Sequence, residues 1–331
     1  MNYAGIDVGS ENLDIVIRKK GKSLKCKQFK NTSSGHLELI RYLRKHKVAR
    51  VGLEATGYYH LDLAIELDDA IDIEVMIINP RASKNFAKAL MSKIKNDAID
   101  AEILAKFVER MDFVAWSSPD HEVFILRACG RRLVFLTKEK TKAKNQLHAL
   151  SLTKRTPDFI IDDLKLTIEQ LEKQIDTIIA HALEIIKQSD QLAKCYKRLI
   201  SIKGVADKTA IKLLGELGVL ENDMSAKQWV SHAGLFPREF QSGNSVHKRT
   251  SIGKIGNKYI REALYMGAMS AAKHDPNIRG FYQHLINDNG LKKIQALCAV
   301  MRKLLVAMHA MLKTDKPFNS QLFYSLDNSP A

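Results

Sequence analysis

The chain has 331 residues and a mass of 37.4 kDa, with 45% apolar and 27% charged residues. These values are typical of a soluble globular protein of about two domains, and they exclude collagen-like, disulfide-scaffold and wholly disordered classes. No apolar run approaches the ~20 residues that a membrane-spanning helix needs, so we expect no transmembrane segment. The first residues show no signal-peptide pattern and the four cysteines lie far apart, which favours a cytoplasmic location.

The positive charge is concentrated in the last two thirds of the chain. The formal net charge is +15, from 52 Lys and Arg against 37 Asp and Glu. Residues 1–125 carry 19 bases and 18 acids, residues 126–198 carry 15 and 9, and residues 199–331 carry 18 and 10. A neutral region joined to two basic ones indicates a polyanionic partner, and nucleic acid is the polyanion this pattern favours.

The first 125 residues alternate between β-rich and helical patterns. In chain order the pattern predicts strands at 3–8, 13–17 and 23–29, a helix around 37–43, a strand at 50–53, a helix at 61–67, a strand at 73–78, and helices at 81–92 and 97–110. This order is typical of a ribonuclease-H-like (RuvC-like) α/β domain with a mixed sheet. We therefore predict such a domain over residues 1–125.

The middle of the chain, residues 126–195, is predicted to be helical. A basic helix covers 126–152 and ends before the break at Thr156-Pro157. After the break, apolar residues recur at alternating spacings of four and three: Leu164, Ile168, Leu171, Ile175, Ile178, Ala182 and Ile185. Such a seam predicts a coiled-coil segment, either an antiparallel hairpin or a contact between protomers, although one helix of an ordinary bundle fits equally well.

The last segment, residues 196–331, is predicted to form a mostly helical domain. It contains an irregular, glycine-bearing stretch at 234–256 and two late helices at about 257–273 and 291–313. Residues 199–210 resemble a helix-hairpin-helix, in which Gly204 allows a tight turn and Lys203 and Lys208 lie beside it. Such a hairpin binds a phosphate through backbone donors. The alternative is a helical corner that only packs.

Four carboxylates are expected at one edge of the predicted sheet. Asp7 lies near the end of the first strand and Glu54 just beyond the end of the fourth, and these strands are parallel neighbours in such a domain. Asp97 and Asp100 share one face at the start of a helix. Because four converging carboxylates repel each other, the set predicts a site for Mg²⁺ or Mn²⁺. Taken singly, each fits a helix cap, a solvated residue or a partner for lysine.

The same first strand permits another interpretation. Residues 5–10, Gly-Ile-Asp-Val-Gly-Ser, are similar to the first phosphate loop of actin- and sugar-kinase-type ATPases. That fold requires a second Asp-x-Gly loop about midway along the chain, and the sequence has none there. The ATPase interpretation is therefore the weaker one.

The stretch from Ala233 to Val246 carries serine hydroxyls beside glycine, with basic residues following it. A hydroxyl in such a loop can attack a phosphodiester once it is activated. Chemistry alone leaves Ser242, Ser245, Ser251 and Tyr259 open as the nucleophile, and a phosphate-binding loop without a covalent role remains the alternative. The basic residues expected to bind nucleic acid are Arg127, Arg131, Arg132, Lys138, Lys142, Lys203, Lys208, Arg238, Lys248, Arg249, Lys254, Lys258 and Arg261.

Taken together and in order, these motifs resemble one family over essentially the whole chain. They are Gly5-Ile6-Asp7, Glu54-Ala55-Thr56-Gly57, Ile78-Asn79-Pro80, Lys95-Asn96-Asp97-Ala98-Ile99-Asp100-Ala101, Ala233-Gly234-Leu235-x-Pro237-Arg238, Ser242-Gly243 and Gly256-Asn257-x-x-Ile260-Arg261. The chain resembles the insertion-sequence transposases of the DEDD/serine type, the bridge-RNA-guided recombinases related to Piv-type DNA invertases.

The resemblance implies a set of roles. It places the metal carboxylates on Asp7, Glu54, Asp97 and Asp100 and the nucleophile on Ser242. It implies strand cleavage through a phosphoserine, strand exchange between donor and target DNA, a Holliday-junction intermediate and an element-encoded guide RNA. It also implies a homo-oligomer, a dimer or tetramer, in which we expect the 164–185 seam to join protomers. The competing functions are a resolvase-like metal-dependent nuclease without a covalent intermediate, and a non-catalytic RNA/DNA-binding scaffold.

Overall fold

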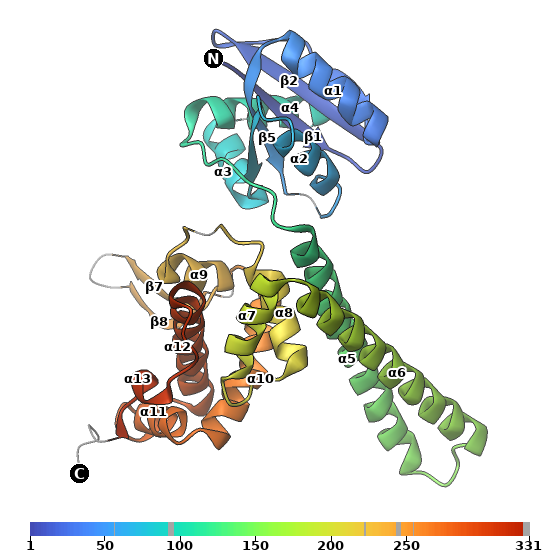
Figure 1. Ribbon diagram of the computed structural model, residues 1–331, viewed down its shortest axis with the longest axis vertical. Coiled ribbons are helices and arrows are strands. Elements are labelled where there is room, and N and C mark those ends of the chain that lie inside the picture. Colours follow the sequence, from blue (N-terminus) through green and yellow to red (C-terminus); the bar gives the residue numbers. More distant parts are fainter. Residues whose placement is uncertain (56, 92–95, 222, 243–245, 254, 327–331) are drawn as a thin grey trace. The chain divides into compact units, whose positions relative to one another are not determined.

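The computed structural model describes residues 1–55, 57–91, 96–221, 223–242, 246–253 and 255–326, with side chains at all of these except 239–242 and 246–251. The chain divides into two compact units, Met1–Ser118 and Pro119–Ala331. Each unit has its own apolar core. Figure 1 shows the elements of both.

The first unit contains a mixed sheet in the order β3-β2-β1-β5-β6, and β4 also pairs with β2. β1 (Asn2–Val8) is antiparallel to β2 (Asn12–Lys19) and parallel to β5 (Val48–Glu54), which is in turn parallel to β6 (Glu74–Ile78). Antiparallel strands beside parallel ones are the arrangement expected from the order of the elements. The predicted ribonuclease-H-like α/β fold is therefore confirmed.

Two strand predictions needed correction. The single strand expected at 23–29 is divided into β3 (Lys22–Ser23) and β4 (Lys27–Lys30), which pair with different parts of β2. Most of this segment is exposed and only Phe29 is buried, so little apolar surface holds it in one straight strand. Glu54, expected just beyond the fourth long strand, is the last residue of β5.

Helices cover both faces of this sheet. α1 (Ser33–Lys45), capped by the Thr32 side chain, and α2 (Leu61–Asp68) contribute to one apolar cluster with the strands. α4 (Asp97–Arg110) contributes Leu104, Phe107 and Val108 to a second cluster, and Phe86 of α3 (Pro80–Ala89) packs against it. The two clusters form the layers on either side of the strands.

The second unit begins with a long helical hairpin, α5 (His121–Ser151) and α6 (Asp158–Gln188), whose helices lie side by side in Figure 1. The apolar seam of α6 is used inside this hairpin, since Ile175 and Ala182 are 1% and 0% exposed within the single chain. The seam that we expected to join protomers therefore packs within the chain, where an antiparallel partner helix covers it.

The remainder of this unit is mostly helical, as expected. Its elements are α7 (Asp190–Ile200), α8 (Asp207–Leu217), α9 (Ala226–Ala233), β7 (Pro237–Ser242), β8 (Val246–Ile252), α10 (Lys258–His274), α11 (Pro276–Asn287), α12 (Lys293–Thr314) and α13 (Ser320–Phe323). The stretch expected to be irregular at 234–256 instead contains the antiparallel β7–β8 hairpin. β-Branched and aromatic residues on β8 and β7 favour strands there, and the glycine content obscured that signal.

Among the described residues, α12 alone is long and apolar enough to pass a length-and-hydropathy test for a membrane span. Its Val300, Met301, Leu304 and Met308 are buried in the core of the second unit, where they pack with residues of α9 and α10. The apolar character of this helix is accounted for by that core.

Candidate active site

The position of α4 on the sheet is set by two glycines. A Cβ atom on Gly5 of β1 would lie 2.1 Å from the Ala105 backbone nitrogen and 2.3 Å from the Ala101 carbonyl oxygen. A Cβ atom on Gly52 of β5 would lie 2.4 Å from Cγ2 of Val108. The α4 backbone therefore rests directly on β1 at Gly5, and the Val108 side chain occupies the space over Gly52, at distances that only glycine permits.

The first turn of α4 carries two of the predicted carboxylates. Asn96 caps the helix, its side-chain oxygen accepting a hydrogen bond from the Ile99 N–H at 2.8 Å. Asp97 and Asp100 lie within this turn, where the positive end of the helix dipole favours negative charge. The local sequence thus fixes the start of the helix and both acidic side chains on it.

Asp7, the sixth residue of β1, is the electrostatic centre of the site. Partial burial, together with the charges of Asp100, Asp97 and Glu54, raises the pKa of Asp7 from its ordinary 3.8 to about 6. Carboxylates shift one another in this way only when they lie close together and poorly screened. The other three predicted acids therefore lie within electrostatic range of Asp7.

Ser83 holds Glu54 in place. The Glu54 carboxylate, at the end of β5, accepts a hydrogen bond of 2.6 Å from the Ser83 hydroxyl. Ser83 is only 5% exposed and lies in α3, one turn beyond the cap formed by Asn79 and Pro80. Sequence reasoning missed this residue. The sequence could have indicated it, because Ser83 follows the helix cap Asn79 by four residues and is the one buried residue of α3 among those the structure describes.

Asp14 is a fifth carboxylate at this site and was also missed. It is the register partner of Asp7 on β2, and it adds to the forces that raise the pKa of Asp7. The Gln28 amide nitrogen lies 3.2 Å from its carboxylate and can donate to it. The sequence did hold a sign of this. Asp14 is a charged residue within the otherwise apolar strand predicted at 13–17, which follows the strand that carries Asp7.

The donor set fits a hard divalent cation. No three histidine, cysteine, aspartate or glutamate side chains in the described parts of the chain form a ready-made metal site. The acids nevertheless supply only carboxylate oxygens, the ligands that Mg²⁺ and Mn²⁺ prefer. Burial and the like charges of the neighbouring acids together raise the pKa of Asp7, and a bound cation would offset the repulsion between those charges.

Ser242 is the last residue of β7, and its register partner is Val246 of β8. Its side chain lies outside the described residues, as do those of Lys248, Arg249, Ser251 and all of Lys254 and Ser245. Two features hold the base of the hairpin. Gly234 ends α9 in the left-handed conformation, with φ of 67°, and Arg261 donates to the Ala233 carbonyl at 2.9 Å.

A buried ion-pair network supports this base. The Glu216 carboxylate, 2% exposed, lies 2.6 Å from Nε of Arg131, 3.4 Å from Nε of Arg127 and 2.6 Å from Nδ2 of Asn257. Burial alone would raise the pKa of Glu216, but the hydrogen bonds from Arg131 and Asn257 and the charge of Arg127 lower it. Asn257 also caps α10, accepting from the Tyr259 and Ile260 N–H groups.

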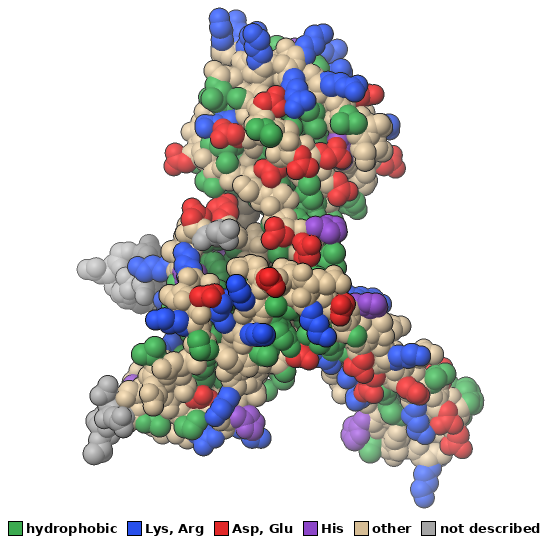
Figure 2. Space-filling model, in the orientation of Figure 1, with side chains coloured by type: hydrophobic (Ala, Val, Ile, Leu, Met, Phe, Trp, Pro, Cys, Tyr) green, Lys and Arg blue, Asp and Glu red, His purple; other side chains and the backbone are tan. Residues whose placement is uncertain are grey.

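The predicted nucleic-acid-binding residues divide into two groups. Several contact the protein itself: Arg127 and Arg131 bind Glu216, Lys138 pairs with Glu262, Lys142 pairs with Glu139, Arg132 donates to Gln174, and Arg261 donates to Ala233. Lys203, Arg238 and Lys258 are exposed, and Lys208 is partly exposed. Figure 2 shows Lys and Arg side chains interspersed with acidic ones on the visible face of the second unit.

The turn at Gly204 packs against α10. Gly204 has φ of +99°, and a Cβ atom there would lie 2.7 Å from the Ala271 nitrogen and the Gly267 oxygen. Glycine is therefore required for packing between helices at this turn. The structure accounts for the glycine without any phosphate, in accordance with the packing alternative.

Comparison with known proteins assigns the family. A family model described as Transposase matches residues 4–154, and a model of the transposase IS116/IS110/IS902 family matches residues 196–283. The pilin gene-inverting protein of Moraxella bovis is 30% identical over 97% of this chain and 98% of its own length. The transposase for insertion sequence element IS1328 of Yersinia enterocolitica is 26% identical over 78% of this chain and 80% of its own length.

A solved structure, T. thermophilus RuvC in complex with Holliday junction substrate, is 17% identical, with a TM-score of 0.27 over 34% of this chain and 96% of that chain. The fold assignment rests on the strand order and pairing described above rather than on this likeness. The family assignment rests on the sequence matches, which extend over both units. The chain therefore belongs to the IS116/IS110/IS902 family of transposases, enzymes that cleave and rejoin DNA.

Proposed function

We propose that the chain is an RNA-guided DNA transposase that exchanges DNA strands through a phosphoserine on Ser242. The electrostatic influence of Glu54, Asp97 and Asp100 on Asp7 is the observation that supports this proposal, since it fits the acidic part of a phosphoryl-transfer site. The family assignment supplies the reaction class. The inversion activity named for the Moraxella relative extends the proposal to site-specific recombination.

The covalent step conserves the phosphodiester. The Ser242 hydroxyl loses its proton, its oxygen forms a bond to phosphorus, and the bond from phosphorus to one bridging deoxyribose oxygen breaks. The released deoxyribose oxygen takes up a proton and becomes a free hydroxyl. A hydroxyl from the other DNA then attacks the phosphoserine, which joins the exchanged strands and returns the serine. No external energy source is required, because one phosphate ester replaces another.

In this proposal the carboxylates of Asp7, Glu54, Asp97 and Asp100 would hold Mg²⁺ or Mn²⁺, and the cation would supply charge neutralisation for the phosphate. Ser83 fixes the direction of the Glu54 carboxylate, and Asn96 fixes the helix start that presents Asp97 and Asp100.

The acids belong to the first unit and Ser242 to the second. We therefore propose that they act together only in the assembled complex, a dimer or tetramer, and that a lone protomer is inert.

Guidance by an element-encoded RNA fits the charge distribution. Residues 126–331 carry 33 Lys and Arg against 19 Asp and Glu, whereas residues 1–125 are nearly neutral. Duplexes of A-form geometry are recognised through shape and backbone phosphates, for which distributed basic surface suffices. Donor and target DNA would then be selected by pairing to the RNA. The setting that fits this reaction is the prokaryotic cytoplasm, at the nucleoid.

One experiment separates this proposal from its competitors. The protein, the RNA, DNA bearing donor and target sites, and Mg²⁺ are incubated together, and denaturing gels are examined for a protein–DNA adduct. We expect an adduct with the wild type, none with Ser242→Ala, and an adduct retained by the matched hairpin variants Ser245→Ala and Ser251→Ala. Asp7→Asn should abolish adduct formation without preventing DNA binding.

Other outcomes would favour other functions. Cleavage that persists in Ser242→Ala, with no adduct in any variant, would indicate a metal-dependent nuclease that uses water. Nucleic-acid binding without cleavage or adduct in the wild type would indicate a scaffold. Efficient recombination by the protein without RNA would overturn the guided mechanism while leaving the serine chemistry intact.

A further inference from the structure

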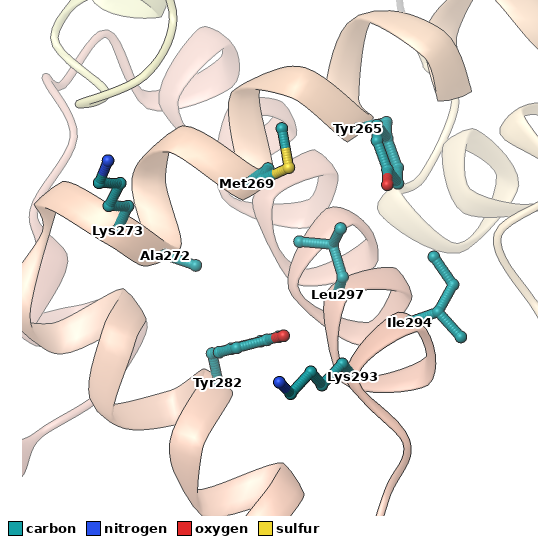
Figure 3. Close-up of a pocket in the computed structure, with 8 residues that line it drawn as sticks. All are labelled: Tyr265, Met269, Ala272, Lys273, Tyr282, Lys293, Ile294 and Leu297. Atoms are coloured by element: carbon teal, nitrogen blue, oxygen red, sulfur yellow. The ribbon is translucent and has the colours of Figure 1, made fainter.

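A pocket of about 440 Å³ opens in the second unit where α10, α11 and α12 meet, outside the residues assigned above. Tyr265, Met269 and Lys273 come from α10, Tyr282 from α11, and Lys293 and Leu297 from α12. Figure 3 shows Tyr282 and Lys293 reaching into the space between the helices that carry them. The volume lies within the range of roughly 300–1,000 Å³ that is usual for small-ligand sites.

The pocket combines a buried apolar floor with an exposed apolar rim. Leu297 is 7% exposed and forms part of the floor. At the rim, Tyr265 is 37% exposed, Met269 is 45% exposed and Ile294 is 53% exposed. Apolar and aromatic groups clustered at an open cavity mark a surface that a ligand or partner covers.

The charged side chains that line the pocket are all positive. Lys273 and Lys293 line it, and none of its lining residues is acidic. Over the residues the structure describes, neither ammonium group takes part in an ion pair, unlike Lys138, Lys142 and Lys144 on the α5–α6 hairpin. Two unneutralised cations beside aromatic rings indicate a ligand that carries both a flat ring and an anion.

We propose that this pocket binds one unpaired nucleotide of single-stranded nucleic acid. The base stacks against a tyrosine ring, Tyr282 or Tyr265, over the Leu297 floor, and the flanking phosphates pair with Lys273 and Lys293. Stacking on aromatic side chains combined with lysine–phosphate pairing is the general mode by which proteins hold unpaired strands. A base inside a duplex has both faces covered by its neighbours, so a duplex would not occupy the pocket.

The inference rests on the family assignment, which makes nucleic acid the partner, and it is independent of the serine chemistry. A second copy of the chain is a less suitable occupant. Two copies meeting symmetrically here would bring the Lys273 and Lys293 charges of both copies together in an apolar contact. The unpaired strand can be DNA or RNA, which share this chemistry, and the binding assay distinguishes them.

Fluorescence anisotropy of labelled oligonucleotides with the full-length protein tests the proposal. Tyr282→Ala is expected to weaken binding of single-stranded DNA, RNA or both by about 5- to 100-fold, as removal of one stacking ring does, while duplex binding is unchanged. Tyr282→Phe, which keeps the ring, should bind like the wild type. If Tyr282→Ala lowers the affinity for single-stranded DNA, the bound strand is DNA. If it lowers the affinity for single-stranded RNA, the bound strand is RNA.

The lysines are tested by salt dependence. Removing both pocket lysines, Lys273→Ala with Lys293→Ala, should lower the slope of log affinity against log salt by between about one and two. The matched control removes two exposed lysines outside the pocket, Lys313→Ala with Lys316→Ala. If the control lowers the slope as much as the pocket pair, the charge effect is general and the pocket assignment is wrong.

Photo-cross-linking locates the contact in the wild-type protein, so that the test does not depend on any variant folding. A single-stranded oligonucleotide with one 5-iodouracil is irradiated with the protein, and the cross-linked peptide is identified by mass spectrometry. We expect cross-links to Tyr265 or Tyr282, and we expect Ser242→Ala to retain them. Cross-links only outside α10–α12, or sedimentation showing that Tyr282→Ala dissociates an oligomer, would overturn the proposal.

Discussion

Gly5 on β1 and Gly52 on β5 are register partners in the sheet, and both lie directly beneath α4. The missing side chain of Gly5 lets the α4 backbone at Ala101 and Ala105, both 0% exposed, touch β1. The missing side chain of Gly52 leaves room for the Val108 and Ile78 side chains. The same contact fixes the height and direction of the first turn of α4. The position of Asp97 and Asp100 beside Asp7 therefore depends on two residues that carry no functional group.

Gly5→Ala is predicted to destabilise the first unit. The new methyl would lie 2.1 Å from the Ala105 nitrogen, so α4 must move away from β1. Overpacking of this kind costs about 1–3 kcal/mol, and backbone atoms cannot rotate aside, so we expect about 3 kcal/mol in urea unfolding. Gly267→Ala in α10 is the control, because its Cβ would meet no atom nearer than 3.6 Å. Equal stability of the two variants would contradict the contact.

The raised pKa of Asp7 makes stability depend on pH. Between pH 3.8 and about 6 the folded protein retains a proton that the unfolded chain has lost. The free energy of unfolding should therefore fall as pH rises through this window. The full shift corresponds to about 3 kcal/mol, and solvent screening of this partly exposed carboxyl reduces the expected fall to about 2 kcal/mol. Asp7→Asn should remove this slope and be the more stable protein at pH 7. Urea unfolding at several pH values measures both.

Two controls test whether the pH dependence of stability arises from the surroundings of Asp7. Asp72→Asn removes an exposed carboxylate that is paired with Arg44 and should leave the slope between pH 4 and 6 unchanged. Addition of Mg²⁺ at pH 7 should raise the melting temperature of the wild type, because a cation that binds only the folded state stabilises it. Asp7→Asn should respond less. Parallel pH profiles for wild type and Asp7→Asn would show that Asp7 has no special environment.

Glu216→Ala is predicted to destabilise the second unit severely. It leaves Arg127 and Arg131 beside a buried space without their shared carboxylate, and Asn257 loses one partner. Removing one side of a buried ion pair costs about 3–5 kcal/mol. The comparison is Glu262→Ala, which breaks the largely exposed pair with Lys138 and should cost less than about 1 kcal/mol. Similar losses in both variants would mean that burial of Glu216 contributes little.

Ile175→Ala is predicted to loosen the α5–α6 hairpin. Ile175 is 1% exposed within the single chain, and truncation of a buried isoleucine to alanine costs about 2–5 kcal/mol. Amide hydrogen exchange in α5 and α6 should accelerate accordingly, and by the same factor at every protein concentration. Leu166→Ala, at a position 53% exposed on the same helix, should have little effect. A loss that grew on dilution would instead place the α6 seam between protomers.

Local sequence patterns predicted much of the fold because their signals act over a few residues. The strands of the first unit, the helix at 97–110 and the seam from Leu164 to Ile185 were all predicted from the spacing of apolar residues within short segments. The order of elements then limited the first unit to a mixed sheet, which placed Asp7 and Glu54 on neighbouring parallel strands. The family likewise followed from ordered motifs.

Tertiary structure decided what those patterns left open. Whether the α6 seam meets its own chain or another, whether Arg131 faces phosphate or Glu216, and whether Gly204 serves a turn or a helix contact all depend on partners distant in sequence. The contributions of Ser83 and Asp14 to the acidic site are of the same kind. Periodicity records which face of an element is apolar, whereas the identity of the facing atoms is set by close packing across the whole chain.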